Sequence, residues 1–197
     1  MKTRWWVVSL CILGLGLASG TVLSQDEGEG QDDEAMMKMF EEMSKPGKEH
    51  AILEPLVGNW GCHVKFWMMP GTPAEESDGT MKRRWILGNR YLVEDYEGEV
   101  METPFQAFGL TAYDKLQKRY DAIWTDSMST GIFRQTGQAD ASGKTITFTG
   151  ENFDPMTMQE EWSKSTVEII NNDKHVMKMF KNGPDGKEFQ HFEMTCN

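Results

Sequence analysis

The chain has 197 residues, of which 39% are hydrophobic and 26% charged, and its net charge is −11 at pH 7. This length fits one domain with a hydrophobic core large enough to fold without staples. The acidic balance argues against nucleic acid or an anionic membrane surface as a partner, because both are bound through Lys and Arg.

Residues 1–24 have the layout of a secretory signal peptide. Lys2 and Arg4 precede an apolar run over residues 5–17, and small residues follow at 18–20. A basic start, an apolar middle and a small-residue end are typical of signals that direct export. We therefore expect a periplasmic or secreted protein.

Two cleavage positions fit this pattern, one before Gln25 and one before Thr21. The alternative is an uncleaved membrane anchor, because the segment 5–23 is nearly long enough to span a bilayer. Cleavage before Gln25 leaves 173 residues and takes the net charge to −13, since the removed segment holds two basic and no acidic residues.

The segment 25–34 contains only Gly, Asp, Glu and Gln and has no apolar residue. Such a tract cannot bury enough surface to order itself, so the composition predicts a disordered acidic linker. Residues 35–197 then form a single domain.

Two short helices are predicted before the first strand. Over 34–44, apolar residues recur at the spacing of one helix face, and Pro46 and Gly47 end the pattern. A shorter helix is predicted over 49–56. We expect these helices to act as a lid or plug for one end of the domain.

The remainder of the chain has the alternation and turn residues of β-strands. The predicted strands cover 60–68, 80–87, 90–97, 105–113, 119–125, 130–138, 145–150, 159–170, 175–181 and 188–196. The connections are too short for crossover helices, so successive strands must pair as antiparallel hairpins. The sequence predicts an all-β, antiparallel up-and-down barrel of about ten strands, with a two-sheet sandwich as the alternative.

Alternation also predicts which side chains face the interior. Tyr120 and Trp124 share one face of their strand, so two large rings point inward there. In the strand 175–181 the inward face stays undecided. The strand 105–113 is apolar on both faces, which predicts that the helical lid covers its outer side.

Two cysteines remain after cleavage, Cys62 on the first strand and Cys196 on the last. In a closed meander these strands are antiparallel neighbours, so a disulfide between them would lock the closing seam. The alternative is two buried free thiols, and the sequence leaves both interpretations open.

Several segments together resemble the bacterial DUF1579 family, a domain of unknown function with a lipocalin-like, calycin-type barrel. They are KPGKEHAILEPLVGNW at 45–60, RYLVEDYEG at 90–98, PFQAFGLTAYDKLQKRY at 104–120 and IWTDSMSTG at 123–131. The resemblance covers residues 35–196 and implies the barrel fold, but it implies no activity. The chain departs from the family pattern at Cys62 and in its FEMTCN ending.

The four histidines are His50, His63, His175 and His191. None lies in an HExxH motif or a Cys/His cluster, so the sequence predicts no metal site. Pairing of the first and last strands places His63 and His191 on the outer wall. Haem would require the reverse, with His191 turned inward as an axial ligand, as in small barrels of the nitrobindin type.

Methionine is frequent, and thioethers in an exported protein are possible ligands for Cu(I). Met36, Met39 and Met43 nevertheless share one helix face, and flexible methionines commonly fill irregular gaps in a core. We therefore favour packing over copper binding.

Neighbouring carboxylates on these strands point to opposite faces, so they do not form an acid–base pair. Asp126 lies at a strand end near Trp124, and Arg90 and Tyr113 are expected to converge on that region. The group is interpreted either as a polar anchor for a ligand head group or as a structural corner network, and the second reading is favoured.

We infer a non-enzymatic exported barrel that binds a small hydrophobic or amphipathic ligand, with no catalytic residue, cofactor or metal predicted. The competing hypothesis is a protein-interaction module with a filled barrel; haem or Cu(I) binding is a lesser alternative. The candidate ligand-binding residues are Trp60, Trp85, Arg90, Tyr113, Tyr120, Trp124, Asp126 and Trp162.

Overall fold

The structure, a computed structural model, describes residues 27–154 and 157–197. The expected signal peptide at residues 1–24 lies outside these ranges. Contacts divide the chain into two units, residues 1–39 and 40–197, and the second contains the β-strands. Within the described ranges, no helix has both the length and the apolar character needed to cross a bilayer.

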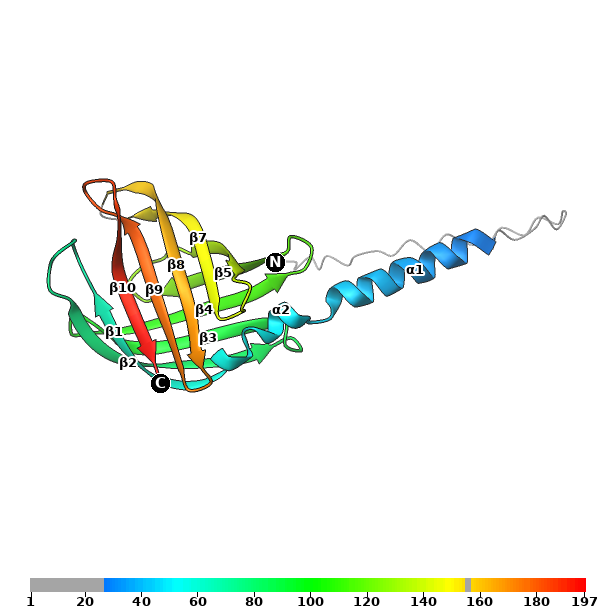
Figure 1. Cartoon of the computed structure of the whole chain (residues 1–197), viewed down its shortest axis with the longest axis horizontal. Helices are drawn as coiled ribbons and strands as arrows, with labels where there is room; N and C mark the ends of the chain where they lie inside the picture. Colours follow the sequence, from blue (N-terminus) through cyan, green and yellow to red (C-terminus); the bar gives the residue numbers. More distant parts are fainter. Residues whose placement is uncertain (1–26, 155–156) are drawn as a thin grey trace, which may run out of the picture. The chain divides into compact units, whose positions relative to one another are not determined.

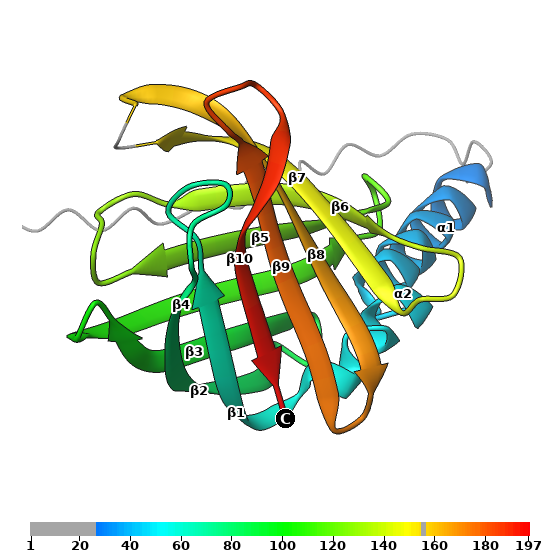
Figure 2. The ribbon, with the colours of Figure 1, turned by 60° about the vertical axis from the view of Figure 1, so that its left-hand side comes forward.

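Ten strands form a closed barrel, as the sequence predicts. They are β1 (Gly58–Phe66), β2 (Glu75–Ile86), β3 (Tyr91–Val100), β4 (Thr103–Asp114), β5 (Arg119–Asp126), β6 (Phe133–Ala139), β7 (Thr145–Asp154), β8 (Gln159–Asn171), β9 (Lys174–Asn182) and β10 (Glu188–Cys196). Each strand pairs antiparallel with the next, and β10 returns to pair with β1 (Figures 1 and 2). The predicted barrel is therefore confirmed, and the alternative of a two-sheet sandwich is excluded.

Among the strands, the largest boundary difference is at the start of β2, which begins at Glu75 rather than at residue 80. Its first residues are polar and include Gly79, so their intrinsic strand preference is low. They pair with β1, from Gly79 opposite Cys62 to Glu75 opposite Phe66. Pairing with a neighbouring strand therefore extends β2 beyond what composition predicts.

The seam between β1 and β10 carries a disulfide, which is one of the two alternatives that the sequence leaves open. Cys62 and Cys196 are direct partners in the register, their Cα atoms are 4.1 Å apart, and the two sulfur atoms are bonded. Both residues are buried, at 3% and 0% exposure. The disulfide thus joins the two strands that close the barrel.

Helix α1 (Glu27–Ser44) begins earlier than predicted, inside the acidic tract for which composition predicts disorder. Glu, Gln and Ala have high helix propensity, and carboxylates near a helix N-terminus are stabilised by the helix dipole. Of the residues in the acidic part of the helix, Glu and Gln favour it, while Gly28 and Gly30 oppose it.

A second helical segment caps one end of the barrel. It consists of α2 (Lys48–Ala51) and the 3-10 helix η1 (Glu54–Leu56). Leu53 and Leu56 are buried in the hydrophobic core beneath it. The carbonyl of Glu49 accepts a hydrogen bond from the Tyr120 hydroxyl at 2.7 Å. This segment acts as the predicted plug, and we call this the capped end.

The expectation that helices cover the outer side of β4 is wrong. Phe108 projects from that side and keeps 38% of its surface exposed. Leu53, between α2 and η1, and Leu56 at the end of η1 instead pack into the capped end of the barrel, where they gain more burial than on its outer wall.

The strand register identifies the inward side chains. Cys62 and Cys196 face the interior, and every second residue from Cys62 along β1 faces the same way. Direct partners on neighbouring strands point to the same face, so the pairings carry this alternation from β1 through β2 to β9. The turns after β2, β4, β6 and β8 lie at the capped end. The connections after β1, β3, β5, β7 and β9 lie at the opposite end, which we call the far end (Figure 2).

Two apolar clusters fill parts of the interior. The first lies beneath the cap and comprises Leu53, Leu56, Leu92, Tyr120, Ile146, Phe148 and Ile169. The second surrounds the disulfide and comprises Trp60, Cys62, Val64, Met81, Tyr96, Met194 and Cys196. Buried polar side chains also face the interior, and they form the candidate site.

Candidate functional site

A buried ion pair joins β2 and β3. Arg83 and Glu94 are direct cross-strand partners, and both face the interior. The Nε–H of Arg83 donates to Oε2 of Glu94 at 2.6 Å. The Arg83 side chain is only 3% exposed and that of Glu94 16% exposed. The pair therefore places a charge-balanced, hydrogen-bonding group inside the barrel.

His175 on β9 extends this group from the other side of the seam. Its Nε2 lies 2.5 Å from Nη1 of Arg83, and its ring stands perpendicular to that of Trp60 with centroids 4.5 Å apart. The residue has no exposed surface. Burial, followed by the charge of Arg83, lowers the pKa of His175 to about 3. The imidazole is therefore neutral at physiological pH.

The second ring nitrogen of His175 lacks a partner. Among the described residues, its Nδ1 is the buried side-chain polar atom for which the protein supplies no hydrogen bond. Buried polar groups are nearly always paired with protein or with an ordered molecule, so this atom marks a place where something else is needed.

A second polar group faces the interior from β6 and β8. Gln135 donates through Nε2 to the hydroxyl of Ser163 at 3.1 Å, and its Oε1 accepts from the hydroxyl of Ser165. All three residues are buried. These hydrogen bonds satisfy the side-chain polar atoms of the group, which gives it a structural role in linking β6 to β8 across the intervening β7.

Trp124 on β5 packs close to the ion pair because its neighbour on β4 is glycine. A Cβ placed on Gly109 would lie 3.1 Å from the Trp124 ring and 3.2 Å from Oε1 of Glu94. Both distances are tighter than usual side-chain contacts. Gly109 therefore leaves the space in which an aromatic face and a carboxylate lie side by side.

At the far end, His191 points inward rather than outward as the sequence predicts. The register between β9 and β10 shifts between Gln190 and Phe192, so His191 is an extra residue in the strand. Its ring contacts those of Phe66 and Phe189, with centroids 6.1 and 6.2 Å away. A one-residue bulge reverses the alternation on which the prediction depends.

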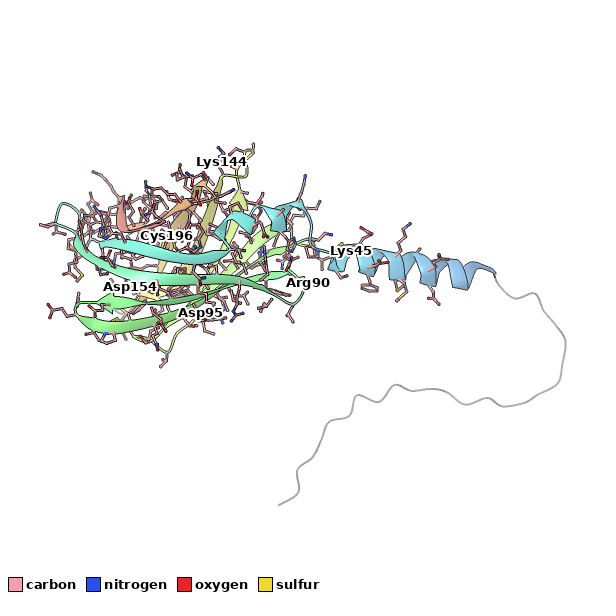
Figure 3. The ribbon with its side chains drawn as sticks, turned by 90° about the horizontal axis from the view of Figure 1, so that it is seen from below. Lys45, Arg90, Asp95, Lys144, Asp154 and Cys196 are labelled. Atoms are coloured by element: carbon pink, nitrogen blue, oxygen red, sulfur yellow. A yellow bond between two sulfur atoms is a disulfide. The ribbon has the colours of Figure 1, made fainter. Side chains whose placement is uncertain are left out.

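The environment of His191 also differs from that of an outer-wall residue. Burial, followed by the positive charge of Lys181, lowers the pKa of His191 to about 4, and the carboxylate of Asp154 opposes this shift. Lys181 and Asp154 form an ion pair at 3.6 Å with side chains 29% and 15% exposed. In Figure 3, Asp154 is labelled away from the capped end of the barrel.

His63, in contrast, lies on the outer wall as predicted. Its Nδ1 is 2.8 Å from Asp78 and its Nε2 is 3.1 Å from Glu76. Hydrogen bonding to Asp78 is the largest effect that raises the pKa of His63. The two nitrogens face different carboxylates, so these residues do not converge on one point.

In the ranges that the structure describes, no group of three or more His, Cys, Asp or Glu side chains is arranged to hold a metal ion. The inward face of β9, undecided from sequence, carries Met177 and Met179, and Met177 is the direct partner of Met194. Met177 packs against the apolar cluster around the disulfide. This placement fits the packing role for methionine.

Two shallow depressions mark the surface. One, of about 370 Å³, lies at the far end between the β1–β2 connection and β10, and its lining includes Trp67, Met69 and Phe189. The other, of about 390 Å³, is lined by residues of β3, β4 and β5, including Phe108 and Asp126.

Five of the predicted ligand-binding aromatic residues face the interior, but they lie in two separate regions of it, one near the ion pair and one beneath the cap. Trp60 and Trp124 lie near the ion pair. Trp85, Tyr113 and Tyr120 pack beneath the cap, where the Trp85 indole donates to Glu54 at 2.7 Å and burial raises the pKa of Tyr120.

Two of the predicted ligand-binding residues, Trp162 and Arg90, do not face the interior of the barrel. Arg90 therefore does not converge with Tyr113 and Asp126 as the sequence predicts. Trp162 faces outward because it is in register with Glu151, and the ammonium group of Lys164 lies 6.0 Å from its ring. Arg90 lies in the β2–β3 turn and donates to the carbonyls of Leu87 and Gly88 (Figure 3).

Asp126 faces inward at the far end of β5 and accepts a hydrogen bond from the backbone of Met128 at 3.0 Å. Arg90 and Tyr113 lie toward the capped end. The group therefore does not form one polar anchor, because strand direction separates residues that are close in sequence.

A family model described as a protein of unknown function, DUF1579, matches residues 45–197. The chain belongs to the DUF1579 family. Among solved structures, the crystal structure of Rv2717c from M. tuberculosis is similar, with 13% identity and a TM-score of 0.58, over 78% of this chain and 98% of that one. A redesigned β-barrel matches with 10% identity and a TM-score of 0.37, over 78% and 97% of the two chains. No match is found among curated proteins.

The likeness to the M. tuberculosis structure supports the barrel fold of this DUF1579 protein and says nothing of its activity. Sequence reasoning missed the Arg83, Glu94 and His175 group. Arg83 lies between Met81 and Trp85 in strand alternation, so an inward arginine was readable from the pattern. Its contact with His175 was not, since the two residues are 92 positions apart.

Proposed function

We propose that this protein is an exported, non-enzymatic barrel that binds a small hydrophobic or amphipathic molecule in its interior. The observation that carries the proposal is the unpaired Nδ1 of His175, buried beside the Arg83–Glu94 pair. A polar atom that the protein leaves unpaired is suited to a bound molecule.

Partial exposure of inward aromatic side chains supports an interior with room for an apolar group. Trp124, Phe133 and Phe192 face inward toward the far end, yet each remains partly exposed. In a completely packed core, such large side chains would lose nearly all contact with solvent.

Export is supported by two independent features. A disulfide at the barrel seam fits an oxidising compartment, because thiols in the cytosol are kept reduced. The pattern of residues 1–24 is that of a cleavable signal.

Fluorescence titration tests the proposal. The mature chain, residues 25–197, is titrated with the neutral probe N-phenyl-1-naphthylamine while tryptophan emission is recorded. Binding in the interior quenches Trp124, so Trp124→Phe should reduce the quenching. The matched control is Trp162→Phe on the outer face, which should leave the Kd for the probe and most of the quenching unchanged.

Absence of probe binding, together with native mass spectra that contain no co-purified molecule, would defeat the binding proposal. Equal effects of the two substitutions would place the probe outside the barrel instead. Either result shifts support to the competing function.

That second function is a protein-interaction module, and one observation favours it. On α1, the apolar side chains of Met36, Met39 and Phe40 are exposed by 51, 55 and 59%. Exposed apolar helix faces often mark binding surfaces. Replacing these three residues with Gln should abolish co-purification of a partner and leave probe titration unchanged.

A further inference from the structure

The hydrogen-bonding roles of the two His175 nitrogens follow from Arg83. An arginine side chain has only N–H donors and stays protonated, so Nε2 of His175 must accept the hydrogen bond from Nη1. A neutral imidazole whose Nε2 accepts carries its proton on Nδ1. The unpaired atom is therefore a donor, Nδ1–H.

Arg83 is held in position to enforce this arrangement. Its Nε–H is already committed to Glu94 at 2.6 Å, and Glu94 lies beside the Trp124 ring across Gly109. Trp60 packs on the His175 ring and fixes its orientation from the seam. The donor is thus preorganised, because neither the imidazole nor its hydrogen-bond partner is free to turn.

The charge of the interior limits which acceptor can bind. The inward basic side chains Arg83 and Lys181 are each paired with a carboxylate, Glu94 and Asp154 respectively. Asp126 and Glu161 add further inward carboxylates toward the far end. Beside His175 itself, Arg83 is already balanced by Glu94, so an anionic head group there would be desolvated without a free counter-charge, while an ammonium group has no lone pair to accept the Nδ1–H.

We propose that the interior ligand is an amphipathic molecule with an uncharged carbonyl, such as an amide or ester, whose oxygen accepts the hydrogen bond from Nδ1–H of His175. Its apolar part extends toward the far end past Trp124. This inference rests on the proposed function and specifies the chemical class of its ligand. The metal alternative at this residue conflicts with the same geometry, since one nitrogen accepts from Arg83 and the other carries a proton.

A chain-length-matched series tests the inference on the mature chain. Dodecanamide, dodecanoate and dodecylammonium are each used to displace N-phenyl-1-naphthylamine. The expected result is that dodecanamide displaces the probe at a concentration about tenfold lower than either charged compound. Dodecylammonium has no lone pair to accept the hydrogen bond, and dodecanoate must leave water as an anion beside an ion pair that is already balanced. In His175→Phe, the preference of the protein for dodecanamide over dodecylammonium should fall, because the amide loses its hydrogen bond, while the probe still binds. His63→Phe on the outer wall is the matched control.

A second measurement avoids dependence on the folding of His175→Phe. The second measurement uses NMR spectra of the unsubstituted protein with ¹⁵N-labelled histidine. Before titration, the spectrum should show a proton bound to Nδ1 of His175, and the chemical shift of this nitrogen should change when dodecanamide is added. Equal displacement by all three compounds, or an unchanged resonance, would overturn the carbonyl inference and leave a buried water as the partner of Nδ1–H. Failure of every compound and of the probe would overturn the proposed function as well.

Discussion

Trp60 links the helical cap to His175. Its ring stands edge-on to the imidazole at a centroid distance of 4.5 Å, while its indole N–H donates to the carbonyl of Leu56 in η1 at 2.9 Å. The same side chain therefore satisfies a backbone acceptor of the cap and packs against the buried polar group.

Replacing Trp60 with Phe should destabilise the protein by about 1–3 kcal/mol, because it removes the hydrogen bond to Leu56 and leaves a gap beside His175. Urea denaturation followed by circular dichroism measures this loss. Trp162→Phe, on the outer face, should cost less than about 0.5 kcal/mol. Similar losses for both variants would contradict the linking role of Trp60.

The barrel was predictable because its signals are local or follow from closure. Alternation placed Tyr120 and Trp124 on one face, and the short turns left only antiparallel hairpins. Closure then made the first and last strands neighbours, which is why Cys62 and Cys196 could be proposed as partners.

The seam disulfide should contribute strongly to stability. It joins residues 134 positions apart, and in the chain-entropy model such a loop restricts the unfolded state by about 5 kcal/mol. Cys62→Ala/Cys196→Ala should lower the free energy of unfolding by roughly this amount, measured in guanidinium chloride. The single variant Cys62→Ala should lose about as much, since either change breaks the bond.

Because both cysteines are buried, the disulfide should also resist reductant in the folded state. Mass spectrometry after alkylation checks this point. The mass should rise only when reductant and denaturant are added together. A mass increase with reductant alone would show that the seam opens in the native protein.

The site was less predictable because it depends on contacts between distant strands. Arg83, Glu94 and His175 come from β2, β3 and β9, and nothing local joins the first two to the third. His191 shows a different limit, since a bulge shifts the register by one residue and turns its side chain inward. No composition signal marks that bulge.

The lowered pKa values of His191 and His175 predict a stability that falls in mild acid. The pKa of His191 in the folded protein is about 4, below its ordinary value of 6.5, and that of His175 is about 3. The contribution of each imidazole to the free energy of unfolding is therefore fully present above pH 6.5. It is lost as the pH falls toward the folded pKa, because the unfolded chain binds the proton more readily, at roughly 1.4 kcal/mol per pH unit.

His191→Phe should reduce this pH dependence by removing one such group. Between pH 6.5 and 5, the free energy of unfolding of the variant should fall by roughly 2 kcal/mol less than that of the unsubstituted protein. Urea denaturation at the two pH values measures the difference. An unchanged dependence would mean that the imidazole is hydrated despite its contacts with Phe66 and Phe189.

His63→Gln provides a control of opposite sign. Asp78 raises the pKa of His63, so its contribution to stability is present below pH 6.5 and is lost as the pH rises through the folded pKa. Removing this group should make the fall in stability at acid pH slightly steeper rather than shallower. Because the residue is on the surface, added salt should weaken the effect.

Gly109→Ala tests whether the space between Trp124 and Glu94 matters for binding. The new methyl group would lie 3.1 Å from the indole and 3.2 Å from the carboxylate, so both side chains must move by a few tenths of an ångström. Since Glu94 holds Arg83, which in turn orients His175, this shift should weaken binding of N-phenyl-1-naphthylamine and dodecanamide severalfold, with only about 1 kcal/mol lost in stability. Fluorescence titration and urea denaturation provide the two readouts.

Gly131→Ala is the matched control, because a Cβ there meets only the Ser129 hydroxyl at 4.0 Å. Unchanged affinity in Gly109→Ala would separate ligand binding from the position of Glu94, and the chain of contacts from Trp124 to His175 would then have only a structural role.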